Sequence, residues 1–196
     1  MRSTYVEILL TDKCAMNKPS EFYEIEIKSL LNKNKYDELL SFFRSEYLEI
    51  NDEIIHTTRY LPNDLRLRYS DKTFEVVYKD GTPTSICRKE IIVPLQDMNH
   101  LIYLEKIFLL EQYSKDRSWI KHKIEFEYPY GDYMYCLCLQ HIYDFGYILE
   151  VEYINSVNDS NIHENNIREV MRKLNCKEID STSFTDKIHK FRVQQA

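Results

Sequence analysis

The sequence contains few residues that break or loosen regular secondary structure. Among its 196 residues there are only 3 glycines and 5 prolines, which leaves little material for a flexible linker between domains. A chain of this length can bury a substantial core as one unit. We therefore expect a single domain that spans residues 1–196. Hydrophobic residues at 43% and charged residues at 30% indicate a globular chain rather than a disordered one.

Long apolar runs and a targeting signal are also lacking. No apolar run approaches the ~18 residues that a membrane-spanning helix needs. The N-terminus shows no basic segment followed by an apolar one and a small-residue cleavage site, the pattern of a signal peptide. We expect a cytoplasmic protein without a membrane partner.

Two further absences concern cysteine spacing and positive charge. The chain has 5 cysteines, and an odd number without framework spacing indicates reduced thiols in an intracellular protein. Cys136 and Cys138 are too close in sequence for a zinc knuckle and have no second pair, so we assign both to core packing. A net charge of -6 argues against broad, non-specific binding of nucleic acid. Any polyanion must therefore enter a local basic site.

Two acidic strands lie near opposite ends of the chain. Residues 23–28 alternate between apolar and charged side chains, as do residues 149–153, and this alternation predicts β-strands whose two faces differ. If the sheet closes on itself, four carboxylates can surround one point. Like charges so close need a neutralising cation, and hard divalent ions such as Mg²⁺ or Mn²⁺ prefer oxygen ligands. The four carboxylates belong to Glu24, Glu26, Glu150 and Glu152.

Basic side chains are sorted onto the middle strands. Alternation predicts strands over residues 64–69, 73–79, 85–94 and 115–128, each with its charges on one face. Two glutamates, Glu75 and Glu90, share these charged faces with the cations. The basic side chains are Lys28 on the first acidic strand and then Arg66, Arg68, Lys79, Arg88, Lys115, Arg117, Lys121 and Lys123.

The other expected elements complete the chain. Helical spacing of apolar residues predicts helices over 35–48, 98–113 and 162–174, with a basic, helical tail. Two more strands are expected over 51–60 and 133–143, while residues 5–10 fit either a short helix or a strand.

These strands can form either an open sheet or a closed barrel. In an open sheet the helices cover the apolar face and the charged face meets water. A closed barrel with helices outside instead surrounds a central polyanion with cations, beside a wall of carboxylates that holds a metal. The sorting of charge by sign favours the barrel, because this arrangement suits a triphosphate and a divalent ion.

The ordered motifs resemble the CYTH domains of the triphosphate tunnel metalloenzyme superfamily. Glu24-x-Glu26-x-Lys28 is similar to the signature of that family, and the basic pairs and residues 146–152 follow in the family's order. The resemblance covers about residues 20–155. It implies an α+β fold built on a closed antiparallel eight-stranded β-barrel, with a charged interior and helices packed outside. It also implies a metal-dependent enzyme that cleaves the terminal phosphate of a triphosphate with Mg²⁺ or Mn²⁺.

The resemblance also implies roles for individual residues. Glu24, Glu26, Glu150 and Glu152 would bind the metal, directly or through water. Glu75 and Glu90 would orient the cations or position water, and Arg117 would act in catalysis as well as in binding. The residues implied for binding phosphate are Lys28, Arg66, Arg68, Lys79, Arg88, Lys115 and Arg117.

One strand resembles a narrower group within the superfamily. Residues 115–119, Lys-Asp-Arg-Ser-Trp, are similar to a strand of the RNA 5'-triphosphatases of fungi and large DNA viruses, with the serine displaced by one. This implies removal of the γ-phosphate from the 5' end of RNA, the first step of mRNA capping, with hydrolysis of nucleoside triphosphates as a side activity. An RNA guanylyltransferase would then be a partner, and a viral version would be located in the viral factory or the virion. We expect Lys121 and Lys123 to form a basic strip at the tunnel mouth that guides RNA.

Two other functions stay open at this point. A CYTH-type enzyme could act on inorganic triphosphate, thiamine triphosphate or ATP, as a phosphatase or an adenylyl cyclase. A module that only binds polyphosphate or nucleotide is a third interpretation, and the intact glutamate pairs on both acidic strands argue against it.

Overall fold

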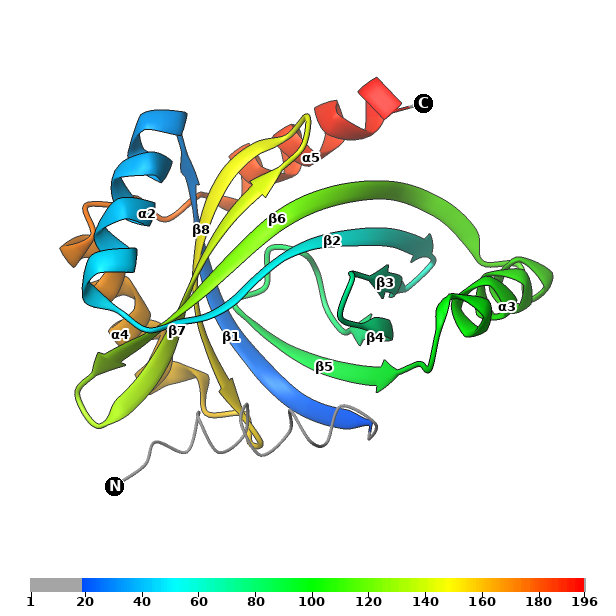
Figure 1. The fold of residues 1–196 in the computed structure, drawn as a ribbon, viewed down its shortest axis with the longest axis horizontal. Helices are drawn as coiled ribbons and strands as arrows, with labels where there is room; N and C mark the ends of the chain where they lie inside the picture. Colours follow the sequence, from blue (N-terminus) through cyan, green and yellow to red (C-terminus); the bar gives the residue numbers. More distant parts are fainter. Residues whose placement is uncertain (1–18, 196) are drawn as a thin grey trace.

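The described part of the chain forms a closed β-barrel of antiparallel strands (Figure 1). The structure is a computed structural model that describes residues 19–195, with side chains up to Phe191. Around the barrel the strands follow the order β1-β5-β4-β3-β2-β6-β7-β8. The strands are β1 (Ser20–Leu31), β2 (Glu49–Leu61), β3 (Asp64–Tyr69), β4 (Phe74–Lys79), β5 (Cys87–Pro94), β6 (Ser114–Tyr130), β7 (Tyr133–Ile142) and β8 (Gly146–Asn155). The predicted barrel is confirmed and the open sheet is wrong; the element expected over residues 5–10 lies outside the described residues.

The barrel closes where the two acidic strands meet. Strand β1 pairs with β5 on one side and with β8 on the other. In the β1–β8 ladder Glu26 lies opposite Glu152, and Lys28 lies opposite Glu150. Closure leaves no unpaired edge among the strands of residues 19–195. It also brings together two segments that are far apart in sequence.

Helices lie outside the barrel. They are α2 (Lys33–Glu46), α3 (Met98–Leu110), α4 (Ser160–Lys173) and α5 (Ser181–Gln195). The side chain of Asn32 caps α2 and that of Asp97 caps α3, each by accepting bonds from backbone N–H groups of the first turn. Among the described residues no helix combines the length and the apolar character required to cross a membrane.

The main hydrophobic core lies between the outer barrel wall and helices α2 and α4, which cover the same side of the barrel (Figure 1). Because strand side chains alternate between the two faces, the apolar partners of the inward-facing charges point outward. Burial of this outer apolar layer supplies the main hydrophobic stabilisation of the fold. The core includes Ile25, Ile27, Leu39, Phe43, Phe126, Leu137, Leu149, Val151, Ile167 and Val170.

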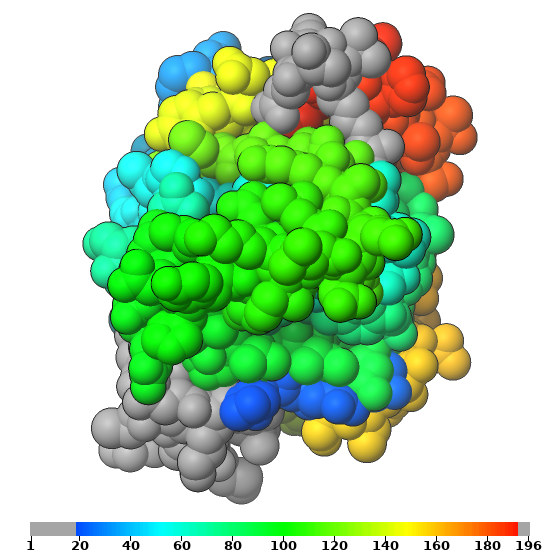
Figure 2. Space-filling view, turned by 90° about the vertical axis from the view of Figure 1, so that its right-hand side faces the viewer, coloured from blue at the N-terminus to red at the C-terminus, as the bar shows by residue number. Residues whose placement is uncertain are grey.

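Helix α3 packs on another part of the barrel wall. Leu101 of this helix contacts a second apolar cluster that contains Tyr60 and Leu67, and the Tyr60 hydroxyl donates a hydrogen bond to Glu105 Oε1 at 2.7 Å. Figure 2 shows the side of the molecule that lies on the right in Figure 1, with α3 and the neighbouring segments, in green, across its middle.

Strand β6 contains an irregularity that changes which side chains face inward. Opposite β2, Arg117 pairs with Arg59 and Lys115 pairs with Tyr60, so that Asp116 is one extra residue, a β-bulge. A bulge reverses the alternation, and Lys115 therefore takes the outward face of Tyr60. The prediction that Lys115 and Arg117 share one face is wrong for this reason.

Candidate active site

Charged side chains from most of the strands line a cavity inside the barrel. The cavity also touches Trp119, Gln140 and several apolar side chains of the barrel and of α5. The charged residues that line it are Glu24, Glu26, Lys28, Arg66, Arg68, Lys79, Arg88, Arg117, Lys121, Lys123 and Glu150.

Three of the four predicted metal carboxylates converge. Glu24, Glu26 and Glu152 each present an oxygen atom, all within 4.8 Å of one another, and all three are buried. We call this group the carboxylate cluster. Glu150 stands apart from it: the side-chain amide of Gln140 donates a hydrogen bond to Glu150, and Lys28 Nζ lies 3.5 Å from its Oε1.

Lysines provide the positive charge beside the carboxylate cluster. Lys79 contacts Glu24 and lies 2.6 Å from Glu90 Oε2, while Lys28 contacts Glu26. Burial alone would lower the pKa of Lys79, but the nearby carboxylates of Glu24 and Glu90 raise it above its ordinary value. Lys79 is therefore positively charged and is held between Glu24 and Glu90.

The carboxylate cluster suits a hard divalent cation. Burial raises the pKa of Glu152 to about 7, although Lys123 opposes the shift, and burial also raises the pKa of Glu26. The buried Oε2 atom of Glu152 has no hydrogen-bond partner among the described residues. A cation held by oxygen ligands would relieve both the mutual repulsion and this unsatisfied acceptor. The residues present therefore fit Mg²⁺ or Mn²⁺.

Arginines dominate the wall formed by β2, β3 and β5. Asp64, at the start of β3, accepts hydrogen bonds from Arg59 at 2.9 Å, from Arg66 at 2.7 and 2.8 Å, and from Arg88 at 2.6 Å. We call these three arginines around Asp64 the arginine cluster. Burial would raise the pKa of Asp64, but the guanidinium groups hold it well below its ordinary value.

Sequence reasoning missed Asp64 and Arg59. The signal for Asp64 was present, because Asp64, Arg66 and Arg68 alternate along β3 and so share its inward face. Arg68 donates a hydrogen bond to Glu75 Oε2 at 2.7 Å. Glu75 therefore contacts one of the inward-facing arginines, and its orienting role stays a prediction.

The basic residues of β6 lie either inside or outside the cavity. Arg117 lines the cavity, and its guanidinium lies 5.3 Å from the Trp119 ring centre, which Arg66 also approaches, at 5.7 Å. Lys115 is outside the cavity: its side chain is 53% exposed and its Nζ lies 3.8 Å from Glu105 on α3.

Lys121 and Lys123 line the inner wall rather than the tunnel mouth. Lys121 donates a hydrogen bond to Gln140 Oε1 at 3.1 Å, and Lys123 Nζ lies 2.7 Å from Glu125 Oε1. Burial, aided by the charge of Lys123, lowers the pKa of Lys121 to about 8. The expected basic strip at the mouth is therefore not formed by these two lysines.

Helix α5 adds an apolar side to the cavity that the sequence did not predict. Phe184, Ile188 and Phe191 of α5 line it together with Phe145 and Ile148. The Phe145 and Phe191 ring centres are 5.4 Å apart. One part of the cavity is thus charged and another is apolar.

Comparison with known proteins identifies the fold. The chain matches no protein-family model and no curated protein sequence. Among solved structures, the PH1819 protein from Pyrococcus horikoshii is similar with a TM-score of 0.65 and 18% identity, over 85% of this chain and 98% of that one. HpAC1 from Hippeastrum, described as having a dominant triphosphatase activity, is similar with a TM-score of 0.57 and 12% identity, over 82% of this chain and 91% of that one.

A third similar structure is part of a larger assembly. One chain of the Mediator head module of Schizosaccharomyces pombe has a TM-score of 0.58 and 11% identity, over 79% of this chain and 96% of that one. At such identities the comparisons establish the architecture only. The function must be argued from the residues in the cavity.

Proposed function

We propose that the protein is a metal-dependent phosphohydrolase that removes the terminal phosphate from a triphosphate bound inside the barrel. The observation that carries this proposal is the buried carboxylate cluster in the same barrel interior as the arginine cluster. Carboxylates of this kind suit a hard divalent ion, and guanidinium groups suit phosphate oxygens. A protein that only bound a polyanion would gain nothing from three buried carboxylates beside it.

The chain's own residues have distinct tasks in this proposal. Glu24, Glu26 and Glu152 would hold Mg²⁺ or Mn²⁺, with Glu150 contributing through water. When bound, the ion supplies a Lewis acid that polarises a phosphoryl oxygen and activates water. Lys28, Lys79 and the inward-facing arginines would bind the phosphate oxygens and offset the charge that develops on them. The residues that would contact phosphate through guanidinium groups are Arg66, Arg68, Arg88 and Arg117.

We further propose that the triphosphate is the 5' end of RNA, with free nucleoside triphosphates also hydrolysed. The support is the resemblance of residues 115–119 to a strand of RNA 5'-triphosphatases, together with the inward positions of Arg117 and Trp119. An aromatic ring beside guanidinium groups can stack on a base.

A second candidate substrate is a small triphosphate, namely inorganic triphosphate, thiamine triphosphate or ATP. The inward position of Lys121 and Lys123 favours a small triphosphate. Because both lysines line the cavity, they do not form a basic path for RNA outside it. A net charge of -6 also disfavours contacts with a long polyanion.

A substrate panel tests both the proposed phosphohydrolase activity and the identity of its substrate. Phosphate release is measured with Mn²⁺ and with Mg²⁺ on triphosphate-ended RNA, ATP, tripolyphosphate and thiamine triphosphate. Turnover of RNA and of ATP supports the RNA assignment, whereas an inert RNA with rapid turnover of a small triphosphate supports the second candidate. Tight binding of tripolyphosphate with no turnover of any substrate would refute the enzyme and leave a binding module.

A further inference from the structure

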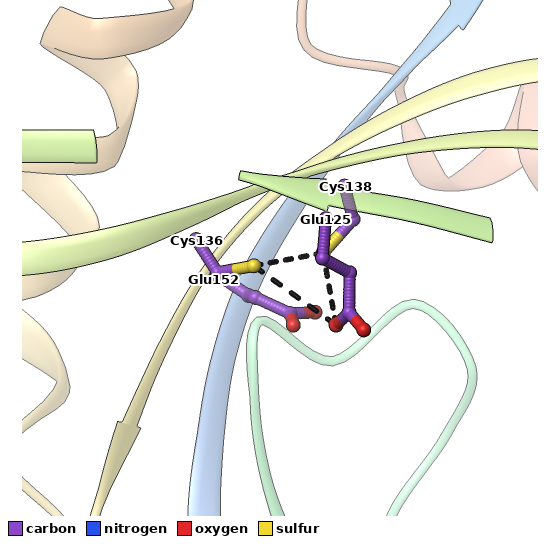
Figure 3. Close-up of side chains that lie close together, drawn as sticks. All are labelled: Glu125, Cys136, Cys138 and Glu152. Carbon is purple, nitrogen blue, oxygen red and sulfur yellow. Dashed lines mark hydrogen bonds between the residues drawn. The ribbon is translucent and has the colours of Figure 1, made fainter. Parts of the chain in front are cut away.

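A second group of ligand-type side chains lies next to the carboxylate cluster. It comprises Glu125 from β6, Cys136 and Cys138 from β7, and Glu152 from β8. In the ladders Glu125 lies opposite Cys138 and Glu152 lies opposite Cys136, so three neighbouring strands direct the four side chains to one place. Figure 3 shows the two thiols and the two carboxyl groups close together.

The separations within this group are close to those of ligands around one ion, although some are longer. The two Sγ atoms are 3.4 Å apart, and Glu125 Oε1 lies 3.8 Å from Cys138 Sγ and 4.0 Å from Cys136 Sγ. All four ligand atoms lie within 4.8 Å of one another. A tetrahedral zinc ion with Zn–S of about 2.3 Å and Zn–O of about 2.0 Å has its ligands roughly 3.3–3.8 Å apart. Small side-chain movements would therefore complete a tetrahedron.

The group already attracts a cation. Lys123 Nζ lies 2.7 Å from Glu125 Oε1 and 3.7 Å from Glu152 Oε1. Glu152 is only 3% exposed, yet its Oε2 has no hydrogen-bond partner among the described residues. The thiols are completely buried and pack on their other side against apolar residues such as Ile50 and Met134. Such surroundings exclude water and strengthen ligand–ion attraction.

We propose that Glu125, Cys136, Cys138 and Glu152 form a binding site for a thiophilic divalent cation, of which Zn²⁺ is the best match. Thiolate ligands select zinc over the hard ions that an all-oxygen cluster prefers. On binding, both thiols release their protons to solvent and become thiolates. Lys123 offsets part of the excess negative charge. This site is distinct from the carboxylate cluster, although Glu152 belongs to both, and the proposal does not depend on triphosphatase activity.

Cobalt substitution tests the site in the complete, unsubstituted chain. The protein is stripped of metal with a chelator, kept reduced with a phosphine, and titrated with Co²⁺. A thiolate-to-cobalt charge-transfer band that saturates at one ion per chain, and that Zn²⁺ then abolishes, is the expected result. A titration without any charge-transfer band would overturn the proposal, and this measurement needs no variant to fold.

Serine substitutions then locate the ligands. Zn²⁺ affinity is measured by competition with a chromogenic chelator for Cys136→Ser, Cys138→Ser and the double variant, with Cys87→Ser and Cys176→Ser as matched controls that lie outside the group. We expect each of the first two to lose at least about tenfold in affinity and the controls to keep the affinity of the unsubstituted chain. An unchanged affinity in the double variant would place the zinc ligands elsewhere and refute the site.

Discussion

The carboxylate cluster and the arginine cluster are two solutions to the burial of charge in one barrel. In the first, three carboxylates share lysines. Burial raises the pKa of Glu26 and Glu152, whereas Lys79 outweighs burial and lowers the pKa of Glu24. In the second, one carboxylate, Asp64, is shared by three guanidinium groups, and its pKa is depressed. The first cluster has an excess of negative charge and the second an excess of positive charge.

This difference explains what each cluster can bind. Lysine ammonium groups are compact point charges that can neutralise carboxylates and still contact phosphate, whereas the arginine fork fits phosphate oxygens with a fixed geometry. Buried ion pairs are poor sources of net stability, because desolvation offsets much of their attraction. The unequal distribution of charge along the lumen is thus better explained by a role in binding ligands than by a contribution to the stability of the fold. The predictions below test the contrast from its largest expected effect to its smallest.

The largest effect is expected from a loss within the carboxylate cluster. Glu26→Ala should abolish phosphate release, because it removes an oxygen ligand and leaves the divalent ion poorly held. The fold should persist, since removal of one of several like charges relieves repulsion in the metal-free protein. Steady-state phosphate release at saturating Mn²⁺ and thermal unfolding measure the two effects.

The control for this variant lies on the same strand. Glu21 has a side chain that is 60% exposed and pairs with Lys89 on the surface, so Glu21→Ala should leave turnover unchanged. Normal turnover of Glu26→Ala at saturating Mn²⁺ would contradict the proposed metal site.

In the arginine cluster the largest effect should be on stability. Asp64→Asn leaves the buried guanidinium groups without their shared anion, which should lower the free energy of unfolding at pH 7 by about 3–5 kcal/mol. Tripolyphosphate should restore more stability to this variant than to the unsubstituted chain. Urea unfolding with and without tripolyphosphate measures the loss of stability and its recovery. The exposed Asp71→Asn is the matched control.

The free energy of unfolding of Asp64→Asn and of the unsubstituted chain should depend differently on pH. The folded pKa of Asp64 lies below its unfolded value of about 3.9, so its contribution is fully present above pH 4 and is lost as the pH falls through the folded pKa. The stability difference between Asp64→Asn and the unsubstituted chain should therefore shrink in acid. A difference that stayed constant from pH 7 to pH 3 would mean that the arginines do not depend on this charge.

A smaller effect is expected at Lys121, which lines the same cavity and lies near Lys123 and Glu150. Its pKa of about 8 means that it loses its proton in mildly alkaline solution. The affinity for tripolyphosphate should therefore fall above pH 8 by up to about tenfold per pH unit, because binding must first return one proton. Lys121→Met should reduce that slope, whereas Lys33→Met on α2, 64% exposed, should not. Calorimetric titration with tripolyphosphate between pH 7 and 9.5 measures the pH dependence of affinity in each protein. Equal slopes in all three proteins would contradict the assignment of this pH dependence to Lys121.

Much of this arrangement could be predicted from the sequence, because it depends on alternation. The period of two put Glu24, Glu26, Arg66, Arg88 and Glu152 on inward faces, and the sorting of charge predicted closure. The sequence also contained the signal for Asp64, on the same face as its arginines. Such patterns predict which face a residue takes, but they do not predict which side chains touch across strands.

The rest depended on irregular or distant features. The bulge at Asp116 shifts the register by one residue, and a one-residue shift turns a side chain to the opposite face. Cys136 and Cys138 are core residues, as predicted. The sequence did not place Glu125 and Glu152 beside them, because these two residues come from two other strands. The position of α5 on the cavity depends on tertiary packing after a loop, which local periodicity does not encode.

The smallest expected effect separates two neighbours on β6. Lys115 and Arg117 are two residues apart, yet only Arg117 lines the cavity, while Lys115 is exposed beside Glu105. Lys115→Ala should alter tripolyphosphate affinity by less than about twofold, as expected for a surface change of under 0.5 kcal/mol. Arg117→Ala should weaken binding by roughly tenfold or more, because charge-assisted hydrogen bonds contribute about 1.5–3 kcal/mol. A loss of affinity in Lys115→Ala as large as that in Arg117→Ala would show that β6 is regular in solution and that the bulge does not turn Lys115 outward.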